Sequence, residues 1–182
     1  MKKTPLWCLF LYWGVFFFIR VSFSFSSLKK SGRKLIRRGK FHHMDMTDLY
    51  QEKILAFARA ARASTLLPSP MATAEIKNPA CGDRVRIDLN YNEDGIIIAI
   101  GAHSEGCALC EAGTGLLLSL AEGRHSDDIL PLAEQLRTWL AHEHENLLTA
   151  DQNAFTPARE FTARHQCITL SFEAAAKAIR NT

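Results

Sequence analysis

The sequence has too few cysteines for a disulfide framework, and no two of them are spaced like zinc-finger ligands. Five cysteines occur in 182 residues, and Cys8 lies in an apolar N-terminal stretch. Twenty-six positions separate Cys81 from Cys107 and sixty separate Cys107 from Cys167, whereas zinc-finger ligands come in close pairs. A folded domain must therefore gather these thiols. Such a site needs a reducing compartment, which we expect to be the cytoplasm.

Acidic residues are missing from the first 43 positions, which hold 10 of the 22 Lys and Arg residues. Residues 44–182 then contain 12 basic and 19 acidic residues, a formal charge of −7. An acidic domain lacks the basic surface that binds phosphate backbones, so we predict no nucleic-acid partner.

An apolar run long enough to span a bilayer is also missing. The run at residues 5–19 is shorter than the roughly 20 residues that a spanning helix needs, and no clear signal-peptidase site follows it. We interpret residues 1–43 as an N-terminal extension, either a mis-assigned start before Met44 or Met46 or a signal or anchor. Residues 44–182 are the predicted functional domain. A membrane partner is expected only if the extension is real.

Alternating and β-branched residues predict a small antiparallel sheet. Residues 84–89 alternate strictly, 92–95 are turn formers and 96–100 are almost all β-branched, which together predict a hairpin. Residues 73–76 supply a short third strand. The predicted sheet has three mostly antiparallel strands over about 73–103 and needs helices to cover one face.

Helical periodicity surrounds this sheet, so the predicted fold class is α+β. The predicted helices run from Thr47 to a point before Pro68, from Ala108 to Glu122, from Asp127 to Ala141 with Ser126 as N-cap, and from about Pro157 to Ile179. Gly113 and Gly115 weaken the second helix and indicate either close backbone packing or mobility.

Three thiols and one carboxylate, from Cys81, Asp83, Cys107 and Cys167, are the candidate metal ligands. Gly82 permits a sharp turn that aims Cys81 and Asp83 at one point. Cys107 begins a predicted helix, where the helix dipole favours a thiolate. Thiolates suit zinc, copper(I) or iron–sulfur chemistry, and a carboxylate makes the set less closed than four cysteines. Taken singly, each cysteine also fits a plain turn or core position.

Arg164 lies three residues before Cys167, on nearly the same face of the last predicted helix. We predict that it lowers the pKa of Cys167 or interacts with sulfur species or with Asp83. Among the histidines, His142 and His144 are predicted to face different sides of a helix and to be surface residues. His165 is retained as a neighbour of the site.

Cys110 forms a C-x-x-C pair with Cys107 at the start of a predicted helix. Such a pair is typical of dithiol redox proteins. The surrounding βαβ pattern of the thioredoxin type is missing from this segment. Cys110 is therefore an alternate ligand, a resolving thiol for a persulfide or a buried residue, and dithiol redox chemistry stays as an alternative function.

Three ordered blocks carry a resemblance to a known family: residues 78–83, residues 104–108 and residues 164–170. They resemble the U-type iron–sulfur cluster assembly scaffolds, namely IscU, SufU and the N-terminal domain of NifU, over a match from Met46 to Ile179. The long segment between the second and third cysteine resembles the SufU branch, whose members carry an insertion there. Gln166 stands where the IscU branch has a histidine, and Cys110 is an additional thiol.

The resemblance implies a scaffold, not an enzyme, that accepts sulfur from a cysteine desulfurase. Cys167 is then the candidate persulfide acceptor, assisted by Cys107 and Arg164. Cys81, Asp83, Cys107 and Cys167 would hold iron or a transient cluster, expected as 2Fe–2S, for transfer to apo-proteins or carriers. The alternatives are a zinc-bound sulfur-transfer protein of the SufU type and a structural zinc domain that only binds partners.

Overall fold

The computed structural model describes residues 46–182, and the N-terminal extension predicted at residues 1–43 lies outside them. The described chain alternates helices and strands in an α+β order. The elements are α1 (Met46–Ala63), β1 (Ala72–Lys77), β2 (Arg84–Tyr91), β3 (Ile97–Glu105), α2 (Ala108–Ala121), the 3₁₀ turn η1 (Ser126–Asp128), α3 (Ile129–Leu140), the 3₁₀ segment η2 (Ala150–Glu160) and α4 (Thr162–Arg180).

The three strands form one antiparallel sheet in the order β1-β2-β3, which confirms the predicted sheet. The β2–β3 hairpin turns at the predicted residues, where Gly95 has φ of +76° and donates its N–H to the Asn92 carbonyl at 2.9 Å. Glycine is favoured there because other side chains rarely adopt a positive φ. β3 continues to Glu105, and so brings the chain directly to Cys107.

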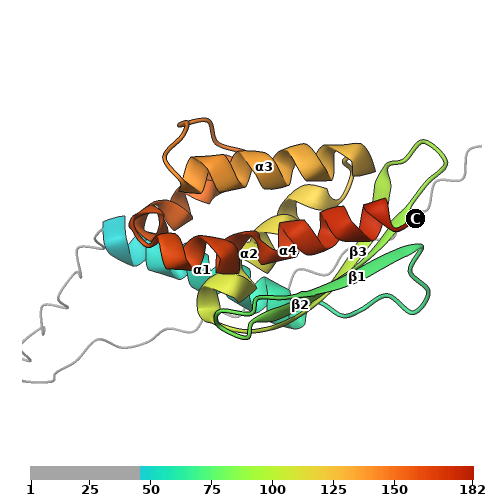
Figure 1. Ribbon diagram of the computed structural model, residues 1–182, viewed down its shortest axis with the longest axis horizontal. Helices are drawn as coiled ribbons and strands as arrows, with labels where there is room; N and C mark the ends of the chain where they lie inside the picture. Colours follow the sequence, from blue (N-terminus) through green and yellow to red (C-terminus); the bar gives the residue numbers. More distant parts are fainter. Residues whose placement is uncertain (1–45) are drawn as a thin grey trace, which may run out of the picture. The chain divides into compact units, whose positions relative to one another are not determined.

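Helix α4 forms the centre of the fold. It packs against β1 and β2 on one side and against α3 and α2 on others, as Figure 1 shows for the sheet and α3. Its residues from Cys167 to Phe172 are all buried, and a helix that is buried on nearly every side belongs to a core. Cys167 therefore enters the site from inside the protein.

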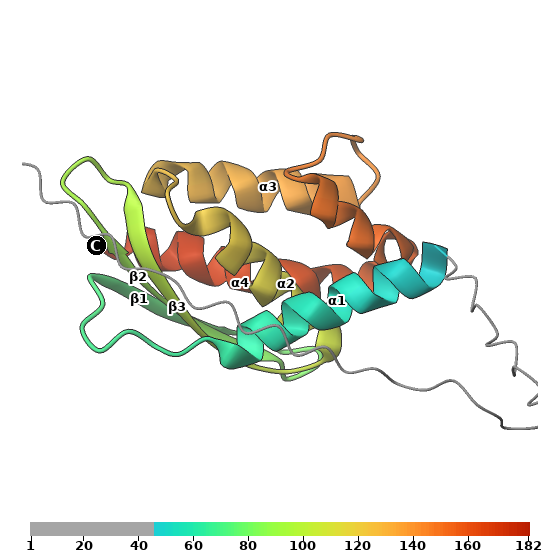
Figure 2. The same cartoon turned by 180° about the vertical axis from the view of Figure 1, so that it is seen from behind.

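Two glycines allow α2 to pack closely against its neighbours. A Cβ added at Gly113 would overlap the main-chain carbonyl of Ile168 in α4, and one added at Gly115 would overlap that of Phe57 in α1. Figure 2 shows α1 and α2 side by side. Of the two predicted explanations for these glycines, close backbone packing is therefore the observed one.

The prediction that Ser126 caps a helix over 127–141 is wrong. Ser126 begins the 3₁₀ turn η1, and the His125 ring accepts the Asp127 N–H at 3.2 Å through Nδ1. Ser126 is held elsewhere, because its N–H donates to the Gly95 carbonyl at 2.8 Å. A tertiary contact with the hairpin thus replaces the local cap, and α3 starts at Ile129.

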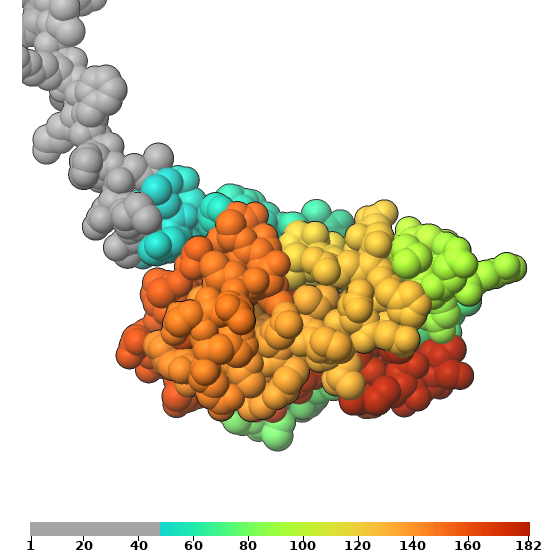
Figure 3. Space-filling view, turned by 90° about the horizontal axis from the view of Figure 1, so that it is seen from above, coloured from blue at the N-terminus to red at the C-terminus, as the bar shows by residue number. Residues whose placement is uncertain are grey.

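The prediction that the last helix starts near Pro157 is also wrong, because η2 contains Pro157 and α4 starts at Thr162. Arg159, which is 6% exposed, holds this segment against the domain. Its guanidinium lies 4.6 Å from the Trp139 ring centroid and makes two 2.8 Å hydrogen bonds with Glu145. Figure 3 shows the face of the molecule that α3 and the chain after it form.

His142 and His144 lie beyond α3, which ends at Leu140, so the prediction that they face different sides of a helix is wrong. Nε2 of His144 lies 2.7 Å from the Thr138 hydroxyl oxygen.

Within residues 46–182, no helix combines the length and the apolar character that crossing a membrane requires.

Candidate metal and sulfur site

The loop between β1 and β2 carries Cys81 and Asp83 and is closed by Asn78. The Asn78 N–H donates to the Asp83 carbonyl at 2.8 Å, and the Asn78 carbonyl accepts the Gly82 N–H at 2.8 Å. Its side-chain oxygen accepts the Ala80 N–H at 3.0 Å. Asn78 is buried, so these bonds are shielded and hold the loop in one shape.

Gly82 has φ of +81°, as the predicted sharp turn requires. An added Cβ would meet no atom within 4 Å, so only backbone strain opposes substitution. We expect Gly82→Ala to lower the free energy of unfolding by about 1 kcal/mol. We expect Gly82→Asn to cost less, because asparagine tolerates this conformation. Chemical denaturation of both variants is the measurement, and equal losses would contradict the strain argument.

The second part of the site is the junction of β3 and α2. Cys107 is the N-cap residue of α2, and its main-chain N–H donates to Asp83 Oδ1 at 3.2 Å. A Cβ at Gly106 would lie 2.7 Å from Asp83 Cγ, so glycine is what allows this approach. The half-buried Cys107 side chain thus stands beside the Asp83 carboxylate.

Helix α4 supplies the third part. Cys81, Asp83 and Cys167 each offer one ligand atom, and these three atoms all lie within 4.8 Å of one another. The two sulfurs of Cys81 and Cys167 are 3.7 Å apart. Of the four predicted ligands, the structure brings these three together, and Cys107 adjoins them through its bond to Asp83.

The Asp83 carboxylate is suited to a cation. Asp83 Oδ2 is buried, and none of residues 46–182 forms a hydrogen bond with it. Burial by itself raises the pKa of Asp83, but the thiols of Cys167 and Cys81 and the Cys107 N–H together lower it. Asp83 therefore carries a negative charge with one oxygen available beside two sulfurs.

The pKa of the Cys167 thiol is raised in the metal-free site, first by burial and then by the neighbouring Asp83 carboxylate. This is opposite to the predicted effect of Arg164, which lies exposed in the first turn of α4. A bound metal reverses such a shift, because coordination deprotonates a thiol. A role for Arg164 with sulfur species or with Asp83 stays a prediction.

Cys110 faces the core on the inner side of α2 and is fully buried. Burial, and then the charges of Asp83 and Cys107, raise the pKa of its thiol to about 12. The nucleophile in thiol exchange is the thiolate, so this environment opposes dithiol redox chemistry by Cys107 and Cys110. Among the predicted roles of Cys110, the structure favours the buried one.

Two residues that position the site were not recognised from the sequence, although they lie within residues 78–83 and 104–108. Asn78 closes the first loop, and the Asn-Pro pair at 78–79 is the turn signal that could have identified it. Gly106 leaves room for the Asp83 carboxylate because it has no side chain, and no local sequence pattern indicates that role. His165, predicted to neighbour the site, uses Nε2 to approach the Arg159 carbonyl at 3.0 Å.

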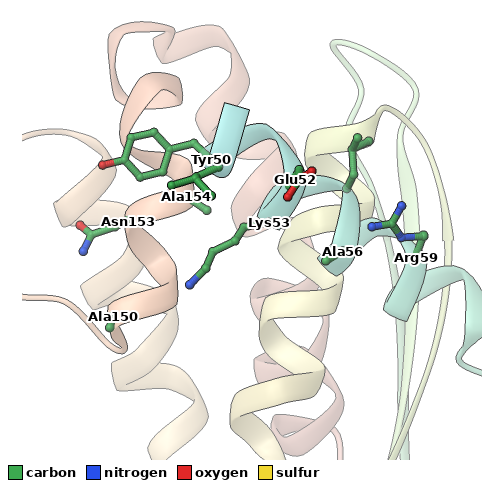
Figure 4. A pocket seen from close by; sticks show the side chains of 10 residues that line it. Tyr50, Glu52, Lys53, Ala56, Arg59, Ala150, Asn153 and Ala154 are labelled. Atoms are coloured by element: carbon green, nitrogen blue, oxygen red, sulfur yellow. The ribbon is translucent and has the colours of Figure 1, made fainter. Parts of the chain in front are cut away.

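A separate hollow of about 810 Å³ lies between α1 and η2. Figure 4 shows Tyr50 and Lys53 on α1 and Asn153 across from them. None of the four predicted ligands lines this hollow. The predicted ligands of the site therefore lie outside this hollow.

The fold and the site define a class of α+β protein in which a thiol and carboxylate cluster lies at the meeting of two loops and a central helix. The model of the NifU-like N-terminal domain matches residues 49–181, and the chain belongs to this family. The resemblance found in the sequence is thereby confirmed.

Individual relatives agree with this assignment. The chain is 23% identical over 137 residues to the zinc-dependent sulfurtransferase SufU of Bacillus subtilis, covering 74% of this chain and 92% of that protein. It is 23% identical over 133 residues to the iron–sulfur cluster assembly scaffold protein IscU of Thermotoga maritima, covering 72% and 93%. A NifU-like N-terminal structure from Brucella abortus superposes with a TM-score of 0.66 at 27% identity, covering 73% and 93%.

Proposed function

We propose that this protein is an iron–sulfur cluster assembly scaffold. It accepts sulfur from a cysteine desulfurase and holds iron or a labile cluster as cargo for recipient apo-proteins or carriers. The observation that carries the proposal is the convergence of Cys81, Asp83 and Cys167 from two elements far apart in sequence, with all three ligand atoms within 4.8 Å. The family, and relatives named as a scaffold and as a sulfurtransferase, support it.

The spacing of the sulfurs fits a metal. Two thiolates on one tetrahedral zinc, each at about 2.3 Å, are about 3.8 Å apart. The Cys81 and Cys167 sulfurs are already separated by 3.7 Å, and the free Asp83 oxygen lies beside them. Cys107 is the proposed fourth ligand, since its N–H already contacts Asp83.

The mixed set of thiolate and carboxylate ligands suits a site that must release the iron or cluster it binds. A carboxylate is a harder ligand than a thiolate and holds an iron–sulfur cluster less firmly. Cys81 is exposed, so one side of the site is open to partners. Three thiolates can therefore bind a 2Fe–2S cluster while Asp83 keeps it labile.

A zinc-bound sulfur-transfer protein is the second candidate. The zinc-dependent relative and Gln166, where the IscU branch has a histidine, favour it. Zinc would hold the thiolates of the site in tetrahedral geometry. A scaffold need not raise the turnover of the desulfurase, whereas a sulfurtransferase does. Desulfurase rates with and without the protein therefore separate the two candidates.

The decisive experiment is metal and acid-labile sulfide analysis of the full chain purified without air. Absorption spectra are recorded before and after addition of a cysteine desulfurase, iron and cysteine. Iron, sulfide and a visible chromophore support the scaffold. One tightly held zinc with no chromophore supports sulfur transfer instead, and loss of the fold on chelation without any response to sulfur donors would indicate a structural zinc domain.

We expect Asp83→Ala to retain a reconstituted cluster longer than the unmodified protein does. The substitution removes the hard ligand that keeps the cluster labile. The measurement is the decay of the visible absorbance after a chelator is added. Asp94→Ala, which removes an exposed carboxylate from the hairpin turn, is the control and should behave like the unmodified protein. Faster loss in Asp83→Ala would contradict the proposed role.

The proposed setting is the reducing cytoplasm. Cys81, Cys107, Cys110 and Cys167 are all free thiols in the structure. Two of them are in contact at 3.7 Å without a bond, and an oxidising compartment would join them and close the site.

A further inference from the structure

Strand β1 is an edge of the sheet, because it pairs with β2 alone among the described strands. The residues of an antiparallel strand direct their main-chain N–H and C=O groups alternately to its two sides. The Asn78 N–H donates to the Asp83 carbonyl at 2.8 Å, so every second residue counted back from Asn78 faces β2 in the same way. The residues between them direct their main-chain groups away from the sheet: Thr73, Glu75 and Lys77.

These outward main-chain groups are open to a further strand. Within residues 46–182, no group accepts a hydrogen bond from the N–H of Thr73, Glu75 or Lys77. The Glu75 carbonyl accepts the Lys177 Nζ at 3.2 Å, and this lysine is exposed on α4. A row of free N–H and C=O groups on a strand is a template for pairing with another chain.

A hollow of about 270 Å³ adjoins this edge, between β1, α3 and α4. Its apolar lining comes from Ile76, Ala133 and Ala176, and the exposed Leu130 adds to it. Ile76 lies on the same side of the sheet as buried Ala74, which is the side that α4 covers. Side chains alternate along a strand, so an added strand would direct every second side chain to the side of this hollow.

The surroundings of the edge are basic, although residues 44–182 as a whole are acidic. Two acidic residues, Glu134 and Glu173, line the hollow, and Glu134 already accepts a 3.0 Å hydrogen bond from Arg137. The other cations of this surface have no carboxylate partner within residues 46–182: Lys77, Lys177 and Arg180. The edge therefore offers free positive charge beside free main-chain donors.

We propose that the β1 edge binds an acidic, extended peptide of a partner protein by strand addition. Peptide carbonyls accept the N–H groups of Thr73, Glu75 and Lys77, and an apolar side chain of the peptide enters the hollow. Lys177 turns from the Glu75 carbonyl to a peptide carboxylate, which leaves that carbonyl to accept a peptide N–H. The main-chain bonds supply affinity, and the hollow and the cations supply selectivity.

A second copy of this chain suits the edge less well than an acidic peptide does. Two copies paired through β1 would bring the free cations of each edge close to those of the other. Like charges across a strand pair are destabilising, and lysines on an exposed edge oppose self-association. The charge of this surface therefore favours an acidic partner.

The edge is continuous with the metal and sulfur site. β1 ends at Lys77, and Asn78 follows it and closes the loop that carries Cys81 and Asp83. A peptide bound along β1 would therefore tether its protein beside the strand that leads into the site. The proposal does not depend on which metal or sulfur species the site binds.

The test uses the isotope-labelled full chain and a synthetic peptide, Glu-Glu-Val-Thr-Val-Thr-Val-Glu-Glu. A control peptide has lysine in place of every glutamate. Binding is measured by fluorescence anisotropy of the labelled peptides, and amide hydrogen exchange is followed residue by residue by NMR. We expect the acidic peptide to bind and the lysine peptide not to bind.

The exchange pattern should alternate along β1. Bound acidic peptide should slow amide exchange at Thr73, Glu75 and Lys77 by at least about tenfold, because their N–H groups gain partners. The amides of Ala74 and Ile76 face β2, so their exchange should change little.

Two pairs of variants separate the main-chain bonds from the charge. Glu75→Pro removes one outward N–H and should weaken binding by at least about tenfold, whereas Glu75→Ala keeps it and should bind within about threefold of the unmodified protein. Proline is tolerated on an edge strand where its nitrogen faces outward. Arg180→Glu should weaken binding by at least about threefold, and Arg59→Glu, an equal charge change on exposed α1, should not. Circular dichroism verifies each fold, and the Arg180 pair and the exchange pattern decide the matter if Glu75→Pro fails to fold.

The proposal is overturned if the acidic peptide does not bind at about 1 mM. Equal binding of the lysine peptide, or binding without the alternating exchange pattern, would also overturn it. If exchange at Thr73, Glu75 and Lys77 slows with protein concentration in the absence of peptide, a second copy occupies the edge and the acidic partner is wrong.

Discussion

Cys167→Ser will weaken zinc binding by more than about a hundredfold. Loss of a group that merely supports a ligand already costs 10- to 100-fold in many metal sites, and Cys167 is itself a proposed ligand. A serine hydroxyl remains protonated where a thiol becomes a thiolate on binding. The Cys167 sulfur lies 3.7 Å from that of Cys81, so its loss removes one side of the site. Competition with a chromophoric chelator gives the affinities.

The control for this prediction is Cys110→Ala. It removes a buried thiol of the same domain that is not part of the converging group. Its zinc affinity should stay within about threefold of the unmodified protein, since it alters no proposed ligand. Unchanged affinity in Cys167→Ser would show that the metal is held elsewhere.

Gly113→Ala will lower the free energy of unfolding by about 2 kcal/mol. Alanine favours a helix over glycine by about 1 kcal/mol, which alone would stabilise α2. The new methyl group, however, would overlap the Ile168 carbonyl in α4, and main chain yields less readily than a side chain. Overpacking costs about 1–3 kcal/mol. The direct overlap with a main-chain oxygen places Gly113→Ala at the upper end of that range, so a net loss of about 2 kcal/mol remains after the gain. Urea unfolding followed by circular dichroism measures the difference.

Ser119→Ala is the matched control on the same helix. Ser119 is exposed and its hydroxyl donates to the Leu116 carbonyl at 2.7 Å within α2. We expect a change within about 0.5 kcal/mol, because helix propensity offsets the lost bond. A Gly113→Ala protein more stable than the unmodified one would mean that α2 and α4 move apart at little cost.

The elements that local pattern specifies agree with their predictions. The alternation at residues 84–89 and the turn at 92–95 became a hairpin, and Gly95 has the positive φ that the turn demands. The helix predicted over 108–122 is observed as α2, Ala108–Ala121. Hydrophobic period and turn chemistry are properties of neighbouring residues, so they are visible in the sequence.

The boundaries that failed depend on distant contacts. Ser126 suits an N-cap, but its N–H bonds Gly95 of the hairpin, and no local signal reports that bond. The start of α4 moved from Pro157 to Thr162, in a segment where Arg159 stacks on Trp139. Tertiary contacts of this kind outweigh propensities of a few tenths of a kcal/mol.

By itself, the sequence determined which residue types are available: three separated thiols, one carboxylate beside a flexible glycine, and an α+β pattern to carry them. Only the tertiary structure decided how they meet. It placed Cys81 and Cys167 at 3.7 Å, buried one and exposed the other, and held Cys107 to Asp83 through the main chain. The physical reason is that residue type and turn formation are local, whereas contact and burial depend on how all the helices pack over the sheet.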